Sequence, residues 1–545
     1  MGTSTSRRPP LPLLAAAVAA VVVMALPLVY LVIRVLDSGE SAWSALWRPR
    51  TAETIATSLL LVVLVAVGVL ILAVPTAWLL SRTDLPFRRV LIVLVALPLA
   101  VPSYVAAYAW IALLPGMSGV LAAALVMSLS TFPYVSIPLM AALRGLDPGL
   151  EESARSLGLG RAAVARRVVL PLMWPAAGAG LLLAALYTLA EFGTVSIFRV
   201  DAFTRVIYAS YRASFDRTAA AVLAVLLVLL ALALVAAEAR VRGRASRWRT
   251  GSGAPRPAAP IHVRGRVRAA GLVWMSCVIG LSLALPVASI IGQLVLSRRR
   301  AFDPEAFLGA LAGSVSASTL GAAVALILAI PLGVLAARYT GRLVRSLEAG
   351  AFAGHGLPGV VIGLALVFLT LMLLPAAYQT LATLAFAYAV LFAPKAVGAT
   401  RAAVGAAPPE LESVARSLGR GPLGAWWQTT GRLAWPGIAA GGLLVLLTAM
   451  KELPATLMLR PTGFETLATR LWSRTEVEAF GAAAPYALAL IVLAALPAWL
   501  MSRWLGSPGS SGRRSQAPRT LDRGDAAADG AWKGAAMHQV KAGPS

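Results

Sequence analysis

The sequence has very little of the chemistry on which metal and cofactor sites depend. One cysteine, Cys277, stands alone among 545 residues, and three histidines, His262, His355 and His538, are scattered along the chain. A single cysteine builds neither a disulfide framework nor a thiolate cluster, and scattered histidines do not make a zinc site. We therefore expect no catalytic residues and no cofactor bound by this chain.

Charged side chains are also scarce, at 13% of residues, whereas 59% of residues are hydrophobic. Soluble globular proteins carry about 25% charged residues, so this balance indicates a membrane protein. The apolar run from Leu11 exceeds the ~7–15 residues of a signal peptide core and is predicted to be a retained first span. About 12 transmembrane helices are expected, because roughly 20 apolar residues cross a bilayer. Their predicted limits are 11–36, 54–80, 90–112, 118–143, 172–196, 218–237, 271–296, 311–337, 350–374, 377–394, 433–457 and 481–502.

The net charge of +25 follows the predicted topology and does not point to nucleic acid. Arginines gather on one side of the predicted membrane, in the N-terminus, between Arg144 and Arg167, and between Arg240 and Arg268. By the positive-inside rule this side is the cytoplasm. We expect a multi-pass protein in the lipid bilayer with both termini in the cytoplasm, and no nucleic-acid partner.

Two halves of the chain repeat each other at a fixed offset of 261 residues. Ala154–Gly158 matches Ala415–Gly419, Trp174-Pro175 recurs as Trp435-Pro436, Glu191 as Glu452, and Phe203 as Phe464. Four matches in one register indicate an internal duplication. A repeat of six spans returns the chain to its starting side, so both copies have parallel orientation. The predicted organisation is a first repeat at 1–237 with a loop at 144–171, a basic cytoplasmic linker at 238–270, a second repeat at 271–503 with a loop at 395–432, and a disordered cytoplasmic tail at 504–545.

Each repeat carries a charged, glycine-punctuated loop on the cytoplasmic side. In the first copy, Asp147 is predicted to cap a helix that begins at Pro148, and Gly158 ends or bends it. A helix lying on anionic lipid would explain the arginines, but not small residues and glycines at matching positions. Docking of a cytoplasmic partner is favoured. The residues assigned to the two docking loops are Glu151, Glu152, Ala154, Arg155, Gly158, Glu412, Ala415, Arg416 and Gly419.

The first loop resembles the EAA loop of ABC-importer permeases. The resemblance rests on Glu152-Ser-Ala-Arg-Ser-Leu-Gly158, followed by nine residues and Val168-Val-Leu-Pro171. In the family this loop forms a coupling helix that sits in a cleft of the ATP-binding subunit. The second copy departs from the pattern, because Ser413 replaces the motif acid and Gly431-Arg432 replaces the Leu-Pro pair. The first loop is therefore predicted to bind the ATPase more strongly.

Other segments resemble the fused two-domain permeases of iron(III) importers. They are LPLAVPSYVAAYAW from Leu97, AEFGTVSIFRVDAFTRVIY from Ala190, and MKELPATLMLRPTGFETLATRLW from Met450. The resemblance implies an all-α membrane protein with two parallel six-helix repeats, the type I ABC importer permease fold, in the bacterial inner membrane. It also implies iron(III) import. Relatives with this architecture import thiamine, phosphonates or polyamines, and these cargoes stay open.

A phosphate-binding G-x-x-x-x-G-K-[ST] loop is absent from the sequence, which has only four lysines. Without that loop the chain is not expected to be an enzyme. ATP and Mg are expected to be used by a separate cytoplasmic ATP-binding subunit, in two copies. An ATP-independent secondary transporter is the alternative, but it gives no reason for two matched docking helices on one face. A membrane-embedded enzyme is disfavoured, because the spans hold no clustered His or Cys.

Ionisable groups inside spans are costly in lipid and usually face the bundle interior. Glu191, Lys451 and Glu452 are therefore assigned to the translocation path or its gate. Glu191 and Glu452 are the candidates for contact with a metal, because carboxylates are hard oxygen ligands. For Lys451 and Glu452, mutual charge compensation is the alternative.

Two external segments, 192–217 and 458–480, follow the fifth span of each half. They carry mixed charge and are expected to meet an extracytoplasmic substrate-binding protein, or else to close the channel mouth as solvated loops. Four prolines are predicted to interrupt the third and fourth spans where these line a cavity, namely Pro98, Pro102, Pro133 and Pro138.

Overall fold

The computed structural model describes residues 9–213, 217–245, 260–296, 302–353 and 356–506. Over these residues the secondary structure is helical, which confirms the predicted all-α class. One isolated β-bridge joins Thr83 and Ile261. Most of the predicted linker and tail, at 246–259 and beyond 506, lies outside the described residues. The first half contains α1 Leu11–Asp37, α2 Gly39–Leu46, α3 Pro49–Arg82, α4 Arg88–Ala96, η1 Leu97–Ala100, α5 Ser103–Leu113, α6 Gly119–Thr131, α7 Pro133–Arg144, α8 Pro148–Ser156, α9 Arg161–Val164, η2 Ala165–Val169, α10 Leu170–Ala190, α11 Gly193–Ile197, α12 Phe203–Ala213 and α13 Thr218–Ala245.

The second half has a similar order of long helices, and up to Ala498 it belongs to the same compact unit. It contains α14 Gly265–Ile279, η4 Gly280–Ala284, α15 Leu285–Leu296, α16 Pro304–Arg338, α17 Arg342–Ala353, α18 Gly359–Leu373, η6 Pro375–Ala377, α19 Leu381–Ala406, α20 Glu410–Ser417, α21 Pro422–Trp426, η7 Trp427–Gly431, α22 Arg432–Ala449, α23 Pro454–Leu459, α24 Leu467–Glu476 and α25 Phe480–Gly506.

Nine helical segments among the described residues are long and apolar enough to cross a membrane. A tenth is counted if Arg88–Ala100 and Ser103–Leu113, which meet at a bend of 92°, form one span. Two shorter apolar helices, Gly359–Leu373 and Phe480–Ala495, occupy the places of the remaining two predicted spans.

The third span of each half is broken, and the break is made by proline. Pro102 and Pro358 have extended backbone (ψ of 137° in both) and immediately precede α5 and α18. The continuous span predicted at 350–374 was therefore wrong, because α17 ends at Ala353 and α18 starts at Gly359. In the fourth span the predicted interruption is slight. Helix α6 ends at Thr131 and α7 begins at Pro133, yet Gly119–Arg144 still counts as one span, and Pro138 lies inside α7 without ending it.

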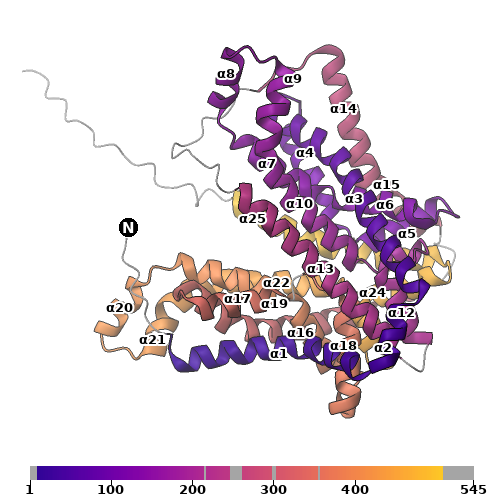
Figure 1. Cartoon of the computed structure of the whole chain (residues 1–545), viewed down its shortest axis with the longest axis vertical. Coiled ribbons are helices and arrows are strands. Elements are labelled where there is room, and N and C mark those ends of the chain that lie inside the picture. Colours follow the sequence, from indigo (N-terminus) through magenta and orange to yellow (C-terminus); the bar gives the residue numbers. More distant parts are fainter. Residues whose placement is uncertain (1–8, 214–216, 246–259, 297–301, 354–355, 507–545) are drawn as a thin grey trace, which may run out of the picture. The chain divides into compact units, whose positions relative to one another are not determined.

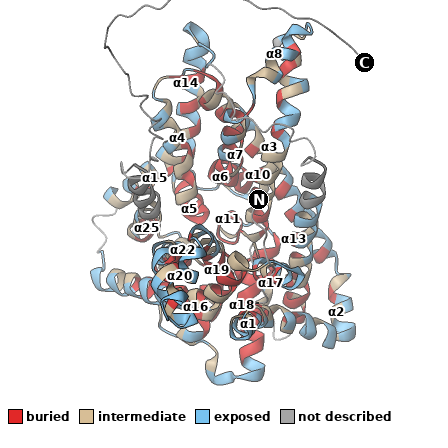
Figure 2. Cartoon of the chain, turned by 90° about the vertical axis from the view of Figure 1, so that its left-hand side faces the viewer, coloured by how far each residue is buried: buried red, intermediate tan, exposed pale blue. Residues whose placement is uncertain are grey.

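The long helices bury small residues against one another and expose many large apolar residues. Figure 2 shows buried and exposed positions on the same helices. In α3, for example, Ala73 and Ala77 are fully buried, whereas Val63 and Ile71 are more than half exposed. Close packing of small residues is what associates helices in lipid, where apolar side chains gain nothing from leaving the solvent. Gly180 of α10 shows the constraint, because a Cβ there would lie 2.4 Å from the Tyr134 carbonyl oxygen of α7.

The first helix of each half packs on the other half (Figure 1). Ala17, Ala20 and Met24 of α1 share a buried cluster with Ala325 and Ala329 of α16. In return, α14 packs on α3 and α4, and α15 packs on α5. The two repeats are thus joined by an exchange of helices as well as by the linker.

The end of the linker is attached to the turn that follows α3. The Ile261 N–H donates to the Arg82 carbonyl at 2.7 Å, and the Val263 N–H donates to Asp84 Oδ1 at 2.9 Å. His262 Nδ1 lies 2.8 Å from Asp84 Oδ2. The Val263 hydrogen bond, and then His262, lower the pKa of Asp84. Because the carboxylate is the favoured form in the folded state, this attachment holds above pH ~4 and weakens only as the pH falls through the lowered pKa.

Asp84→Asn is expected to loosen this attachment, because it removes the charge and one of two acceptor oxygens. Tryptic cleavage at Arg264 and Arg266 in membranes should become about threefold faster, the small effect typical of an exposed polar contact. Asp37→Asn, at the end of α1, serves as the control. Cleavage at the wild-type rate in the Asp84 variant would contradict the attachment.

Candidate functional site

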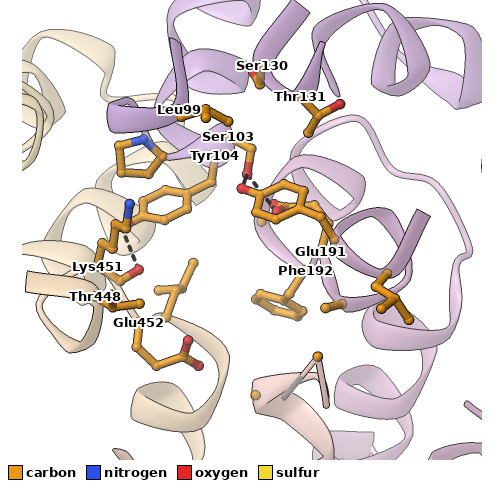
Figure 3. Close-up of a pocket in the computed structure, with 18 of the residues that line it drawn as sticks. Leu99, Ser103, Tyr104, Ser130, Thr131, Glu191, Phe192, Thr448, Lys451 and Glu452 are labelled. Atoms are coloured by element: carbon orange, nitrogen blue, oxygen red, sulfur yellow. Dashed lines mark hydrogen bonds between the residues drawn. The ribbon is translucent and has the colours of Figure 1, made fainter. Parts of the chain in front are cut away.

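Both halves line a cavity of about 620 Å³ (Figure 3). Its wall is formed where helices are interrupted, at the η1–α5, α10–α11, α17–α18 and α22–α23 breaks, together with parts of α6, α7 and α19. The three residues assigned from sequence to the path, Glu191, Lys451 and Glu452, all lie on this wall. Figure 3 shows Lys451 and Glu452 on the second half across from Glu191 and Ser103 on the first.

Glu191 lies in the break between α10 and α11, not inside a helix that runs to 196 as predicted. Its backbone is extended (φ −71°, ψ 125°), and its Oε1 accepts the Thr194 N–H at 2.9 Å, which caps α11. Oε2 accepts the Ser103 hydroxyl at 2.6 Å, and Ser103 accepts the Tyr187 hydroxyl at 2.8 Å. Both carboxylate oxygens are engaged, and the side chain is buried. Glu191 therefore ends α10 and caps the start of α11, and the extended backbone of a capping residue cannot be part of a continuous helix.

Glu452 occupies the equivalent break but has fewer partners. Its Oε1 accepts the Ala455 N–H at 3.1 Å, as Glu191 does from Thr194. Where the first half has Ser103, the second has Gly359, and a Cβ there would lie 2.1 Å from Glu452 Oε1. Within the described residues the other oxygen of Glu452 has no hydrogen-bond partner, so this half-buried carboxylate is the one free to meet a solute.

Lys395 is a cavity residue that sequence reasoning missed. The loop predicted at 395–432 begins later, because α19 continues to Ala406 and carries Lys395 inside the membrane. Lys395 Nζ donates to Thr448 Oγ1 at 3.1 Å and lies 5.2 Å from the centre of the Phe392 ring. The signal was available, because a lysine between apolar residues in LFAPKAVGA resembles an intramembrane charge more than a loop residue.

Lys451 also lines the cavity, and its carbonyl accepts the Tyr104 hydroxyl at 3.2 Å. Among the described residues, no ion pair within 4.0 Å joins Lys451 to Glu452, or Lys395 to either carboxylate. Over the same residues, no group of three or more His, Cys, Asp or Glu side chains converges in a way that could hold a metal ion. The cavity therefore presents separate charges instead of neutralised pairs.

The first docking loop forms the helix α8, capped as predicted. Asp147 accepts the Gly149 N–H at 2.9 Å, and Pro148 occupies the first turn. Glu151 Oε1 lies 2.6 Å from Arg82 Nη2 at the end of α3, and Oε2 lies 3.3 Å from Arg155. Arg82 is buried, so this pair fixes α8 to a membrane helix.

The second loop, α20, repeats this arrangement in spite of its altered motif. Glu412 Oε1 lies 3.2 Å from Arg338 Nη2 at the end of α16, and Arg416 lies 4.0 Å from Oε2. Arg338 also donates to Thr430 Oγ1 at 2.9 Å, and Thr430 donates to Glu412. The residues that replace the Leu-Pro pair leave the backbone unchanged, because a short π-helix precedes the long helix in both copies, as η2 and η7.

Both loops end in the same glycine turn. Gly158 and Gly419 have φ of +84° and +83°. The N–H groups of Leu159 and Arg420 donate to the carbonyls of Ala154 and Ala415 at 3.2 and 3.1 Å. This is the Schellman arrangement, in which a left-handed residue closes a helix.

The outer faces of the loops differ in their chemistry. Ala154 is buried under α8 and Ala415 is half-buried, so the small residues face the protein. Leu157 and Leu418 are 83% and 77% exposed. Glu152 is also exposed, whereas the second loop has Ser413 at that position. The exposed surface of each loop is thus apolar at its end and carries an acid at a different position in each copy, Glu152 in the first and Glu410 in the second.

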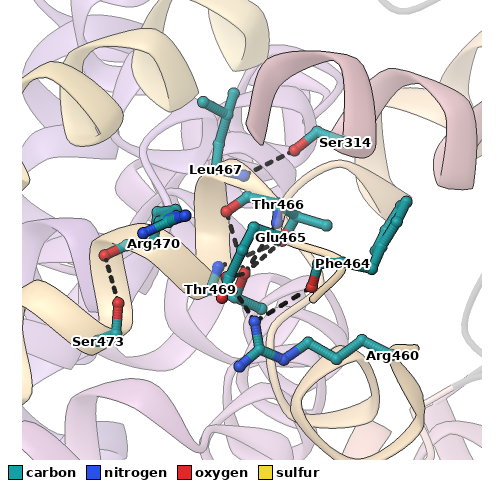
Figure 4. Close-up of polar contacts among 9 residues, drawn as sticks. All are labelled: Ser314, Arg460, Phe464, Glu465, Thr466, Leu467, Thr469, Arg470 and Ser473. Carbon is teal, nitrogen blue, oxygen red and sulfur yellow. Dashed lines mark hydrogen bonds and ion pairs between the residues drawn. The ribbon is translucent and has the colours of Figure 1, made fainter. Parts of the chain in front are cut away.

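The two segments predicted to be external, 192–217 and 458–480, are helical and packed over their described residues, and are not loose loops. In α24, Thr466 caps the helix with Thr469, and the Leu467 N–H donates to Ser314 of α16 at 2.8 Å (Figure 4). Arg460 pairs with Glu465 and donates to the Phe464 carbonyl. In the first half, the Phe203 N–H donates to Ser58 of α3 at 3.1 Å. Each segment is anchored to the second span of its own half, α3 or α16.

Comparison with known proteins agrees with this architecture. The family described as "Binding-protein-dependent transport system inner membrane component" matches residues 70–247 and again 329–504. The Fe(3+)-transport system permease protein FbpB 2 of Haemophilus influenzae is 32% identical over 501 residues, which cover 91% of this chain and 99% of that protein. The sulfate transport system permease protein CysT of Salmonella typhimurium is 30% identical over 189 residues, 32% of this chain and 68% of its own. The molybdenum transport system permease protein ModB of Mycobacterium bovis is 32% identical over 200 residues, 34% of this chain and 75% of its own.

Proposed function

The chain belongs to the inner-membrane components of binding-protein-dependent transport systems, and on that basis we propose that it is the permease subunit of an ATP-driven importer of iron(III). The observation that carries the cargo is the similarity to an Fe(3+)-transport permease along 91% of the chain, whereas the sulfate and molybdenum relatives match about a third. The cavity supports transport, because four charged side chains line it, three of them where helices are broken.

A separate ATP-binding subunit supplies the energy in this proposal, and the permease holds no nucleotide site of its own. Two copies bind, one at α8 and one at α20, with ATP and Mg on those subunits. The exposed Leu157 and Leu418 support this, because an apolar side chain at the tip of a polar helix suits a partner's cleft. In this reading both termini are cytoplasmic, and the α12 and α24 segments meet the substrate-binding protein outside.

The continuity of the helices supports a mechanical route from each loop to the cavity. Through η2, the first loop continues into α10, whose 21 residues span about 30 Å and end beside Glu191. Through η7, the second loop continues into α22, which ends near Glu452. Each loop is also paired to α3 or α16. A movement of an ATP-binding subunit therefore shifts three helices of one half together, namely α8, α3 and α10 in the first half or α20, α16 and α22 in the second. Such rigid-body motion exposes the cavity to the two sides in turn.

The test is reconstitution of the chain in proteoliposomes with its ATP-binding and substrate-binding subunits. We expect radioactive iron(III) to accumulate only when ATP and the loaded binding protein are both present. A partner ATPase that lacks its phosphate-loop lysine is the control and should give no uptake. If the purified binding protein carries thiamine, a phosphonate or a polyamine in place of iron, the cargo is overturned and the permease role stands.

A further inference from the structure

The charges of the cavity wall are inconsistent with a bare ferric ion as the transported species. Among the described residues that line it, four carry charge: Glu191, Glu452, Lys395 and Lys451. Their formal charges cancel. A trivalent cation would enter this half-buried space with nothing to balance its charge, which is among the most costly transfers out of water.

Hydrogen bonds make the cavity still less favourable for a bare ferric ion, because they occupy most of its carboxylate oxygens. Glu191 already accepts from Ser103 and Thr194 with its two oxygens. Glu452 has one oxygen free of partners in the described part of the chain. A bare ferric ion would therefore meet one available carboxylate oxygen and two ammonium groups, which repel it.

The lysines instead fit an anion. Lys395 donates one of its three hydrogens to Thr448, so two remain for a ligand. Both lysines come from the second half. At the repeat-related positions of the first half, Tyr134 stands in place of Lys395 and Ala190 in place of Lys451. The wall is thus polarised, with cations on one side of the cavity only.

Resting on the proposed function, we propose that iron(III) crosses this cavity still bound to an oxyanion, and that Lys395 contacts the oxygens of that anion. Phosphate and carboxylate share the chemistry required, which is anionic oxygen that ligates ferric iron and accepts from an ammonium group. The cavity volume of about 620 Å³ lies in the range of sites that enclose small molecules, far above the need of one ion.

The experiment uses proteoliposomes with the complete transporter and binding protein loaded with radioactive iron(III), in two arms that add labelled phosphate or labelled citrate. We expect one of the two labels to accumulate in step with iron, in an ATP-dependent manner. Lys395→Gln should lower uptake of iron and of that label at least tenfold, and Lys395→Arg should keep most of it. Arg401→Gln is the matched control, because Arg401 lies on the same helix, is exposed, and pairs with Glu348.

Thermal melting of each variant separates transport from folding, and the arginine variant shows whether charge alone restores uptake. Iron that accumulates with neither label would overturn the inference and leave the iron importer standing. Iron uptake within twofold of wild type in Lys395→Gln would overturn it as well. If the wild-type transporter accumulates no iron in either arm, the proposed function fails and this inference with it.

Discussion

Glu452→Gln is expected to reduce ATP-dependent uptake by roughly 10- to 100-fold while the protein inserts and melts as the wild type does. Glutamine keeps the oxygen that accepts the Ala455 N–H, so the cap of α23 survives. What is lost is the negative charge of a half-buried carboxylate, and one interaction with a charged group amounts to about 1.5–3 kcal/mol. Uptake rates at several cargo concentrations are the measurement.

Glu191→Gln provides the contrast, because this carboxylate uses both oxygens to hold the protein together. Glutamine has only one side-chain oxygen in place of these two acceptors. If that oxygen accepts the Ser103 hydroxyl, the NH₂ group faces the Thr194 N–H, which is also a donor. We expect a lower melting temperature, corresponding to about 1–3 kcal/mol for a buried group left unsatisfied. Equal uptake by wild type and Glu452→Gln would rule out a role for that charge in transport.

Gly158→Val and Gly419→Val are expected to separate ATP hydrolysis from transport, with uptake about tenfold lower and ATPase activity retained. Both glycines have φ near +84°, where a β-branched residue is strained by at least ~1–2 kcal/mol. The Schellman turn that ends each loop helix would open, and the exposed Leu157 or Leu418 would be displaced from its partner.

Nearby glycines make this test specific. Gly160 and Gly421 have open space around them and ordinary φ, so Gly160→Val and Gly421→Val add the same side chain without that strain. They should transport within about twofold of the wild type, as surface substitutions usually do. Unchanged uptake in Gly158→Val and Gly419→Val would remove the coupling assignment. If the first loop binds more strongly, Gly158→Val should have the larger effect.

The prediction of the loops succeeded where chemistry is local and failed where it depends on distant residues. Asp147, Pro148 and Gly158 act on their own backbone neighbours, so capping rules predicted both ends of α8. The ion pairs of Glu151 with Arg82 and of Glu412 with Arg338 were not found. Their arginines are related by 256 residues and not by 261, because the end of the third span is longer in the second half, where α18 has 15 residues and α5 has 11.

That difference also altered how the second loop is understood. A motif comparison aligns Glu152 with Ser413 and treats the second copy as lacking its acid. In the structure the acid that holds each loop to the membrane helices is the preceding one, Glu151 or Glu412, and both copies have it. The exposed Glu152 is the part that the copies do not share.

The cavity was predicted in part. A buried acid in an apolar segment is visible in sequence, and Glu191 and Glu452 were assigned on that basis. Whether the second oxygen of each carboxylate accepts a hydrogen bond depends on a residue about 90 positions away. That residue is Ser103 in the first half, which donates to Glu191, and Gly359 in the second half, which has no side chain to donate to Glu452. Hydropathy also cannot end a span at a residue that caps the next helix, so Glu191 was placed within a helix.

The exchange of first helices between the halves has a consequence for biosynthesis. Helix α1 is made first, yet the small residues that it packs against lie on α16, which leaves the ribosome about 300 residues later. During that interval α1 must wait in the bilayer beside lipid, while α3 awaits α14. Neither repeat can therefore reach its final packing before the other is inserted. Because the two repeats are fused, they are synthesised in equal number and inserted next to each other.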